Sequence, residues 1–182
     1  MHTTRAKAMF AAALAGTLMA VASPATANAQ SPQSGDPTPS SVQAGEAWML
    51  LNANGKVLQP VSSANGARVV QRTRASGSNT QYWFDILDEP YWSFENFSSG
   101  LNLGIDGASK AAGANAITAN GSSDHNQDWI KDTSIYVGGV FRLKNRNSGL
   151  CLGISGGSTA DGAQAAQFPC DTSANQRWSL TH

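Results

Sequence analysis

From residue 46 onward, apolar and polar residues alternate in short stretches. Residues 92–95 (Trp-Ser-Phe-Glu) and 141–144 (Phe-Arg-Leu-Lys) both alternate in this way, which places one side of a strand in a core. No long stretch there repeats apolar residues with the 3.6-residue period of a helix. Dipeptides that favour positive φ and tight turns lie between the stretches; they are Asn54-Gly55, Asn65-Gly66, Asn120-Gly121 and Asp161-Gly162. The pattern predicts an all-β domain built of hairpins.

The first 29 residues have the pattern of a secretory signal peptide. Arg5 and Lys7 precede an apolar run over residues 8–21, and the small-x-small sequence of residues 27–29 follows. The run is shorter than the roughly 20 apolar residues of a spanning helix, whereas its flanks fit a cleavage site. We therefore expect cleavage after Ala29 and a secreted, extracellular protein whose mature chain has no membrane span. The alternative is a buried N-terminal helix.

The next segment, residues 30–45, is rich in Ser, Pro, Gly, Gln and Thr. That composition is typical of a flexible linker, because it offers too few apolar groups to form a core. The remaining residues, 46–182, have the length of one ordinary domain. We expect the folded domain to begin near Glu46.

Charge argues against a nucleic-acid partner. The whole chain carries 12 basic and 12 acidic residues, and loss of Arg5 and Lys7 with the leader leaves a net charge of 10 − 12 = −2. The basic residues gather only in the short group Arg68, Arg72 and Arg74. Nucleic acid requires a basic face with several phosphate contacts. A nearly neutral surface rich in Asn, Ser and Gly favours an uncharged partner.

Cys151 and Cys170 are the only cysteines of the chain. In an exported protein the default state of such a pair is a disulfide. A zinc site requires four ligands, and the mature chain adds only His125 and His182. We expect a structural disulfide, and neither a metal nor another cofactor.

A threefold repeat underlies this pattern. Three Gln-x-Trp triplets occupy residues 81–83, 127–129 and 176–178, with their tryptophans 46 and 49 residues apart. Residues 96–105 align with residues 145–154, and residues 52–58 form a shorter version of the same segment. Internal repeats of this length indicate one structural unit per repeat. The predicted boundaries are about 46–89, 90–135 and 136–182.

Three repeats that end in Gln-x-Trp resemble the ricin-B lectin domain, a family of carbohydrate-binding modules, over residues 46–182. The resemblance implies a β-trefoil, in which twelve strands form six hairpins: three make a barrel and three close one end. It also implies a disulfide within the third repeat, at Cys151 and Cys170. For the triplets we expect a structural role, because a buried Trp fills the axis of the trefoil and the Gln satisfies backbone groups that are costly to bury unpaired; these residues are Gln81, Trp83, Gln127, Trp129, Gln176 and Trp178.

The family resemblance also implies where sugar binds. Sugar hydroxyls require hydrogen-bonding groups, and the C–H face of the ring packs on an aromatic side chain. Family sites combine an Asp after the Cys-Leu pair, an aromatic residue in the following strand and the Asn before Gln-x-Trp. In the third repeat these positions hold Gly153, Phe168 and Asn175, with Gln176 beside them.

The other two repeats retain fewer of these groups. The second repeat has Gly104 and Ala119 at the first two positions and keeps Asn126 and Gln127. The first repeat has Gln59 and Arg72, and either Asn79 or Thr80 at the third position. No repeat carries the complete set. We expect weak recognition of a neutral oligo- or polysaccharide, with the best site in the third repeat.

Two residues of the third repeat leave alternatives open. Phe168 could pack in the barrel or at a strand edge instead of contacting sugar. Asp161, like Asp106 of the second repeat, could supply a carboxylate from a nearby loop.

Two other functions fit the sequence less well. An enzyme would need a nucleophile with a base or two carboxylates across a cleft; the mature chain has two histidines, and Asp85, Asp88 and Glu89 follow a Trp in an apparent loop. A trefoil that binds a protein, as an inhibitor or adhesin, would show an exposed apolar patch. The aromatic residues to inspect for such a patch are Trp48, Tyr91 and Trp92, whose alternation favours the core.

Overall fold

The computed structural model describes residues 46–134 and 136–182. The signal peptide and the linker predicted for residues 1–45 lie outside these described residues. The described residues form twelve strands and five single-turn 3-10 helices, with four strands in each predicted repeat. We call these units the first, second and third lobes.

The lobes share one order of strands, and the second and third lobes each have an additional 3-10 helix after their second strand. The first lobe has β1 (Ala47–Asn52), β2 (Val57–Pro60), β3 (Val69–Arg72), η1 (Asn79–Gln81) and β4 (Trp83–Asp88). The second has β5 (Tyr91–Asn96), β6 (Asn102–Ile105), η2 (Asp106–Ala108), β7 (Ala116–Ala119), η3 (His125–Gln127) and β8 (Trp129–Asp132). The third has β9 (Arg142–Asn145), β10 (Cys151–Ile154), η4 (Ser155–Gly157), β11 (Ala165–Phe168), η5 (Ala174–Gln176) and β12 (Trp178–Thr181).

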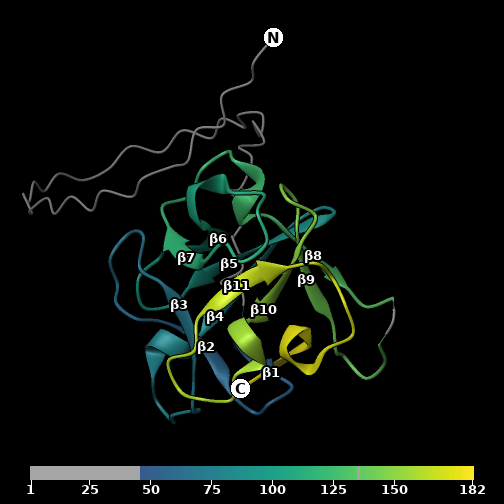
Figure 1. Cartoon of the computed structure of the whole chain (residues 1–182). Helices are drawn as coiled ribbons and strands as arrows, with labels where there is room; N and C mark the ends of the chain where they lie inside the picture. Colours follow the sequence, from purple (N-terminus) through teal and green to yellow (C-terminus); the bar gives the residue numbers. More distant parts are fainter. Residues whose placement is uncertain (1–45, 135) are drawn as a thin grey trace, which may run out of the picture. The chain divides into compact units, whose positions relative to one another are not determined.

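The first and last strands of the lobes form a closed barrel. Antiparallel pairing runs from β12 through β1, β4, β5 and β8 to β9, and a bridge between Phe141 and Trp178 closes the ring. The remaining strands form three hairpins, β2–β3, β6–β7 and β10–β11 (Figure 1). Single bridges join these hairpins pairwise, such as Arg68 with Ile117 and Asn115 with Ala166. This is the β-trefoil expected from the repeat.

One large cluster of apolar side chains fills the barrel. It contains the tryptophans of all three triplets, each buried, together with apolar residues of β2, β6 and β10 such as Leu58, Leu103 and Leu152. Inward and outward residues alternate along β5, where Phe94 is fully buried between half-buried neighbours. The alternating stretches of the sequence therefore mark strands of the barrel wall.

Two local expectations differ from the structure. Asp85 and Asp88 lie in β4 and not in a loop. Strands β4 and β5 pair without interruption, from the pair of Trp83 and Asn96 to the pair of Asp88 and Tyr91. Of the four turn dipeptides, Gly55, Gly66 and Gly162 adopt positive φ, but Gly121 is not among the positive-φ glycines of the described residues. The backbone there is held differently, because Asn120 donates to Asn65 and accepts from Gln127.

Candidate functional site

Strand register places equivalent residues of the three lobes. Arg72, Ala119 and Phe168 each lie opposite the first residue of the preceding strand, which is Val57, Asn102 or Cys151. Gln59, Gly104 and Gly153 follow two residues later in those strands. The second residues of the 3-10 helices are Thr80, Asn126 and Asn175. Thr80, and not Asn79, is therefore the first-lobe equivalent of Asn175.

In the third lobe the predicted site residues converge on Gly153. A Cβ atom added to Gly153 would lie 3.0 Å from Gln176 Cγ, 3.3 Å from Asn175 Nδ2 and 3.3 Å from Phe168 Cδ2. Phe168 and Asn175 are half-buried, whereas Gln176 is buried. The lobe thus presents a partly exposed ring and a carboxamide over a glycine that lacks the family's carboxylate.

Hydrogen bonds fix the two amide side chains of this group. Asn175 Nδ2 donates to the carbonyl of Ile154 at 2.9 Å, and no described residue donates to Asn175 Oδ1. Gln176 Nε2 donates to the carbonyl of Pro169 at 2.9 Å, and its Oε1 accepts from the Asp171 N–H at 3.1 Å. Asn175 Oδ1 therefore keeps an acceptor for a ligand hydroxyl, while Gln176 holds the loop between β11 and η5.

The second lobe arranges its equivalent residues in the same way, but they are packed more tightly and its Asn is buried. A Cβ on Gly104 would lie 2.8 Å from Gln127 Cγ, and Ala119 supplies no ring. Asn126 is buried and donates to the carbonyl of Ile105 at 2.7 Å. Its Oδ1 is buried without a hydrogen-bond partner among the described residues. In this conformation the oxygen is closed off from a ligand.

In the first lobe the equivalent position is occupied. Gln59 Oε1 accepts a hydrogen bond of 3.0 Å from Gln81 Nε2. Because this contact links the positions of Gly153 and Gln176 directly, a side chain of the protein fills the space where the family's Asp would stand.

The Gln-x-Trp triplets hold the interior of each lobe. Each Trp indole N–H donates to a Leu carbonyl of the same lobe, at 3.2 Å for Leu58, 3.1 Å for Leu103 and 3.0 Å for Leu152. Gln81 and Gln127 bond the loop before their 3-10 helix, as Gln176 does, through the carbonyls of Thr73 and Asn120. The Gln and Trp of each triplet thus lie inside the fold, and the glutamines position the segment that carries Thr80, Asn126 or Asn175.

Cys151 and Cys170 form the expected disulfide, which joins β10 to the loop after β11. The two loop carboxylates lie in other surroundings. Asp161 accepts from the Lys56 ammonium at 2.8 Å and from Thr73 N at 2.8 Å, and the hydrogen bond from Lys56 lowers the pKa of its carboxyl. Asp106 is exposed in η2. Asp161 therefore ties the third lobe to the first and is engaged there.

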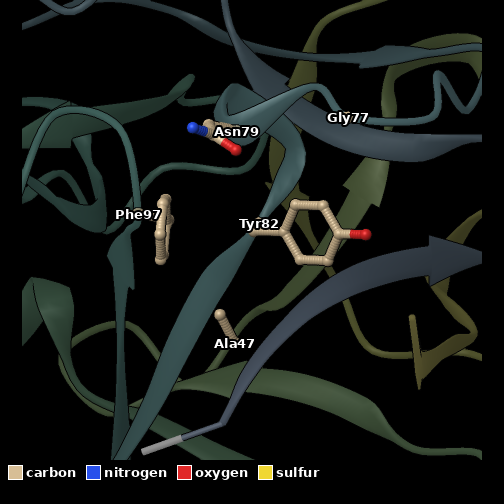
Figure 2. A pocket seen from close by; sticks show the side chains of 5 residues that line it. All are labelled: Ala47, Gly77, Asn79, Tyr82 and Phe97. Carbon is tan, nitrogen blue, oxygen red and sulfur yellow. The ribbon is translucent and has the colours of Figure 1, made fainter. Parts of the chain in front are cut away.

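A cavity that sequence reasoning missed lies where the first and second lobes meet. It measures about 350 Å³ and is lined by Ala47, Gly77, Asn79, Tyr82 and Phe97. In the view of Figure 2 the Asn79 amide and the Phe97 ring lie to one side of the Tyr82 backbone, and the Tyr82 ring extends to the other. Its residues come from three separate segments, around residues 47, 77–82 and 97, so only a comparison of Tyr82 and Phe97 with their repeat equivalents could have drawn attention to them.

The residues considered for catalysis or for protein binding make contacts within the fold. Asp85 accepts from the Lys131 ammonium at 2.7 Å, and that nitrogen lies 3.4 Å from the centroid of the Trp92 ring. Burial lowers the pKa of Lys131, against the opposing effect of Asp85. The Trp48 and His182 rings lie 3.9 Å apart, and Arg146 covers Tyr91. Trp48, Tyr91 and Trp92 are half-buried and do not form an exposed patch.

Within residues 46–134 and 136–182, no group of three or more His, Cys, Asp or Glu residues could hold a metal ion. In the same part of the chain, no helix is long and apolar enough to cross a membrane.

Comparison with known proteins points to one family. The profile of the family described as "Ricin-type beta-trefoil lectin domain-like" matches residues 38–119 and 125–182. Among solved structures, the designed threefold-symmetric protein ThreeFoil is 31% identical with a TM-score of 0.70, over 75% of this chain and 98% of that one. No curated protein sequence matches.

Two natural proteins are similar in structure. The ricin B-like lectin of Macrolepiota procera, solved in complex with lactose, is 21% identical with a TM-score of 0.66, over 79% of this chain and 99% of the lectin. The exo-beta-1,3-galactanase from Clostridium thermocellum is 29% identical with a TM-score of 0.69, over 74% of this chain but 30% of the galactanase.

Proposed function

Because the chain belongs to the ricin-type β-trefoil lectin domain-like family, a carbohydrate-binding and in general non-catalytic family, we propose that it is a secreted protein that binds neutral glycans weakly through its third lobe. The observation that carries the proposal is the convergence of Phe168, Asn175 and Gln176 over Gly153. The ring offers a face for sugar C–H groups, and Asn175 Oδ1 offers an acceptor for a hydroxyl.

Weak affinity follows from what the third lobe lacks. A hydrogen bond to a carboxylate contributes about 1.5–3 kcal/mol, against about 0.5–1.5 kcal/mol for a neutral group. At the family's Asp position Gly153 supplies no side chain, so each sugar contact is made by neutral groups. Neutral groups also give an anionic sugar no counter-charge, which supports an uncharged ligand.

A second candidate function rests on one surface observation. Ile86 and Leu87 of β4 are 45% and 48% exposed, so each face of this strand offers one apolar side chain to a partner. If the third lobe binds no sugar, a protein partner at β4 becomes the leading function.

A glycan and polysaccharide array tests the proposal. The array compares the protein with its Phe168→Ala and Asn175→Ala variants and with Thr80→Ala as a matched control, because Thr80 is the first-lobe equivalent of Asn175. We expect binding that both third-lobe substitutions weaken and Thr80→Ala leaves unchanged. Binding insensitive to the third-lobe substitutions, or no binding at millimolar glycan, would overturn the third-lobe site.

A further inference from the structure

The cavity between the first and second lobes differs from its counterparts elsewhere in the trefoil. Strand pairing makes Trp48, Trp92 and Phe141 equivalent, since each faces the Trp of a Gln-x-Trp triplet. The residues before them, Ala47, Tyr91 and Val140, are therefore equivalent as well. Of the three, Ala47 has the smallest side chain and leaves the most space.

Backbone hydrogen bonds give the equivalents of the two aromatic residues. The Phe97 N–H donates to the Tyr82 carbonyl at 2.9 Å, and the Arg146 N–H donates to the Asp128 carbonyl at 2.9 Å. The Ala53 N–H makes the same bond with Arg177 at 3.0 Å. Tyr82 and Phe97 thus stand where the junction of the second and third lobes has Asp128 and Arg146.

At the junction of the second and third lobes, the Tyr91 ring stands where the first junction has Ala47. Arg146 lies 4.1 Å above the Tyr91 ring and pairs with Asp128 at 3.0 Å. There the chain itself places a planar polar group on an aromatic face. At the first junction Ala47 and Phe97 replace Tyr91 and Arg146, so the space of the Tyr91 ring is left open and the exposed ring of Phe97 stands in place of the guanidinium.

The residues that line the cavity favour a neutral ligand with an apolar face. None of the five lining residues is charged at neutral pH, two are aromatic, and Asn79 brings a carboxamide that both donates and accepts. The Phe97 side chain is 47% exposed, and the centroid of its ring lies 5.4 Å from that of Phe84. A volume of about 350 Å³ falls within the range of small-ligand pockets, about 300–1,000 Å³.

We propose that this cavity binds the ring of a neutral hexose residue, with the C–H face of the sugar on Phe97 and a hydroxyl at the Asn79 amide. It shares no residue with the third-lobe group, and it is not one of the three positions related by the repeat. The protein then has two sugar sites of different construction, and a polysaccharide that reaches both is bound more tightly than either site alone allows.

The test is a titration of ¹⁵N-labelled protein, followed through backbone amide shifts, with methyl glycosides of neutral hexoses and with lactose. We expect the amides of Asn79, Tyr82 and Phe97 to shift and saturate. Phe97→Ala weakens this response about tenfold or more because a ring contact is lost. Ala47→Tyr abolishes it by filling the cavity as Tyr91 does at the other junction, and the spectra report whether each variant folds.

Phe168→Ala is the matched control and leaves the response of the cavity amides unchanged. Absence of shifts at Asn79, Tyr82 and Phe97 with every sugar would overturn the inference, as would shifts that Phe97→Ala and Ala47→Tyr leave unaltered. The amides of Phe168 and Asn175 report on the third lobe in the same spectra, so failure of one site is distinguished from failure of the other.

Discussion

At the scale of single residues, two glycines decide the shape of the family's sugar position. Gly104 and Gly153 lie under the methylene stem of a buried Gln, and a Cβ at either would come within 2.8 or 3.0 Å of that stem. Because hydrogen bonds hold both glutamines at their amides, the stem cannot swing aside freely. An Asp at either position would require a different placement of the Gln side chain. The present packing therefore depends on having a glycine where the family has its Asp.

We expect Gly153→Ala to destabilise the protein by about 1 kcal/mol. Overpacking costs about 1–3 kcal/mol, and the lower entropy of the unfolded Ala chain offsets about 0.4–1 kcal/mol of that cost. Urea denaturation measures the change. Gly104→Ala, with its closer 2.8 Å contact, is the matched comparison and costs more. Equal or higher stability of both variants would show that the glutamine stems move easily.

The site residues divide into those a motif reveals and those it does not. Phe168, Asn175 and Gln176 could be predicted because the repeat fixes their register against the other lobes. The crowding above Gly153 could not, because it depends on where the Gln176 stem lies. Nor could the cavity, since Ala47, Tyr82 and Phe97 meet only when β1, β4 and the turn after β5 are assembled.

At the scale of elements, alternation predicted strands well and their ends poorly. Residues 92–95 lie within β5 as expected. The sequence after Trp83 looks like a loop because charged residues interrupt it, yet β4 continues to Asp88. Cross-strand pairing of Ile86 and Leu87 with Ser93 and Trp92 extends the hairpin, and pairing between two strands is not visible in the alternation along one of them.

The disulfide stabilises one such element, the β10–β11 hairpin and the loop that leads to Asn175. Cys151 and Cys170 are 19 residues apart, and closing a loop of that length contributes about 3 kcal/mol in the chain-entropy estimate. We expect denaturation midpoints to fall accordingly when a reductant is present. The double variant Cys151→Ala/Cys170→Ala should start at the lower stability and show no response to the reductant.

Acid sensitivity is expected at the β8–β9 hairpin. Asp132 accepts hydrogen bonds from the Ser134 hydroxyl and from Arg142, which lower the pKa of its carboxyl from 3.8 to about 2. A depressed carboxyl pKa stabilises the fold fully above the unfolded value, and this contribution is lost as the pH falls through the folded value. The sensitive window is therefore about pH 4 to pH 2.

Asp132→Asn tests this window. The variant should lose part of the decline in stability between pH 4 and pH 2, while thermal denaturation at pH 7 shows a small loss because the pair with Arg142 is broken. Asp161→Asn serves as a comparison, because the pKa of Asp161 is also lowered but its carboxylate lies in a different contact. An unchanged acid profile in Asp132→Asn would assign the acid sensitivity to other carboxyls.

At the scale of the whole molecule, the interior has threefold pseudo-symmetry and the surface does not. The repeat could be found in the sequence because every lobe needs the same buried Trp and the same Gln bonds to its loop. Surface positions carry no such requirement, so Phe168, Ala119 and Arg72 differ at one equivalent position and Ala47, Tyr91 and Val140 at another. Both proposed binding sites lie where the symmetry is broken.

The shared interior leads to a prediction that covers all three lobes. Trp83→Phe, Trp129→Phe and Trp178→Phe each remove an indole N–H that donates to a Leu carbonyl at 3.0 to 3.2 Å. Each also removes part of a fully buried ring. Together the unpaired carbonyl and the cavity should cost about 2–4 kcal/mol per substitution, with the three values close to one another.

Urea denaturation of the three variants measures these costs, and each double variant shows whether they add. Because the three rings belong to one core cluster, we expect the doubles to depart from additivity, as neighbouring sites do. A substitution in one lobe that costs far less than the other two would contradict the equivalence. It would mean that the lobe can repack around a smaller ring, and that the threefold symmetry of the hydrogen bonds does not extend to the energetics of the core.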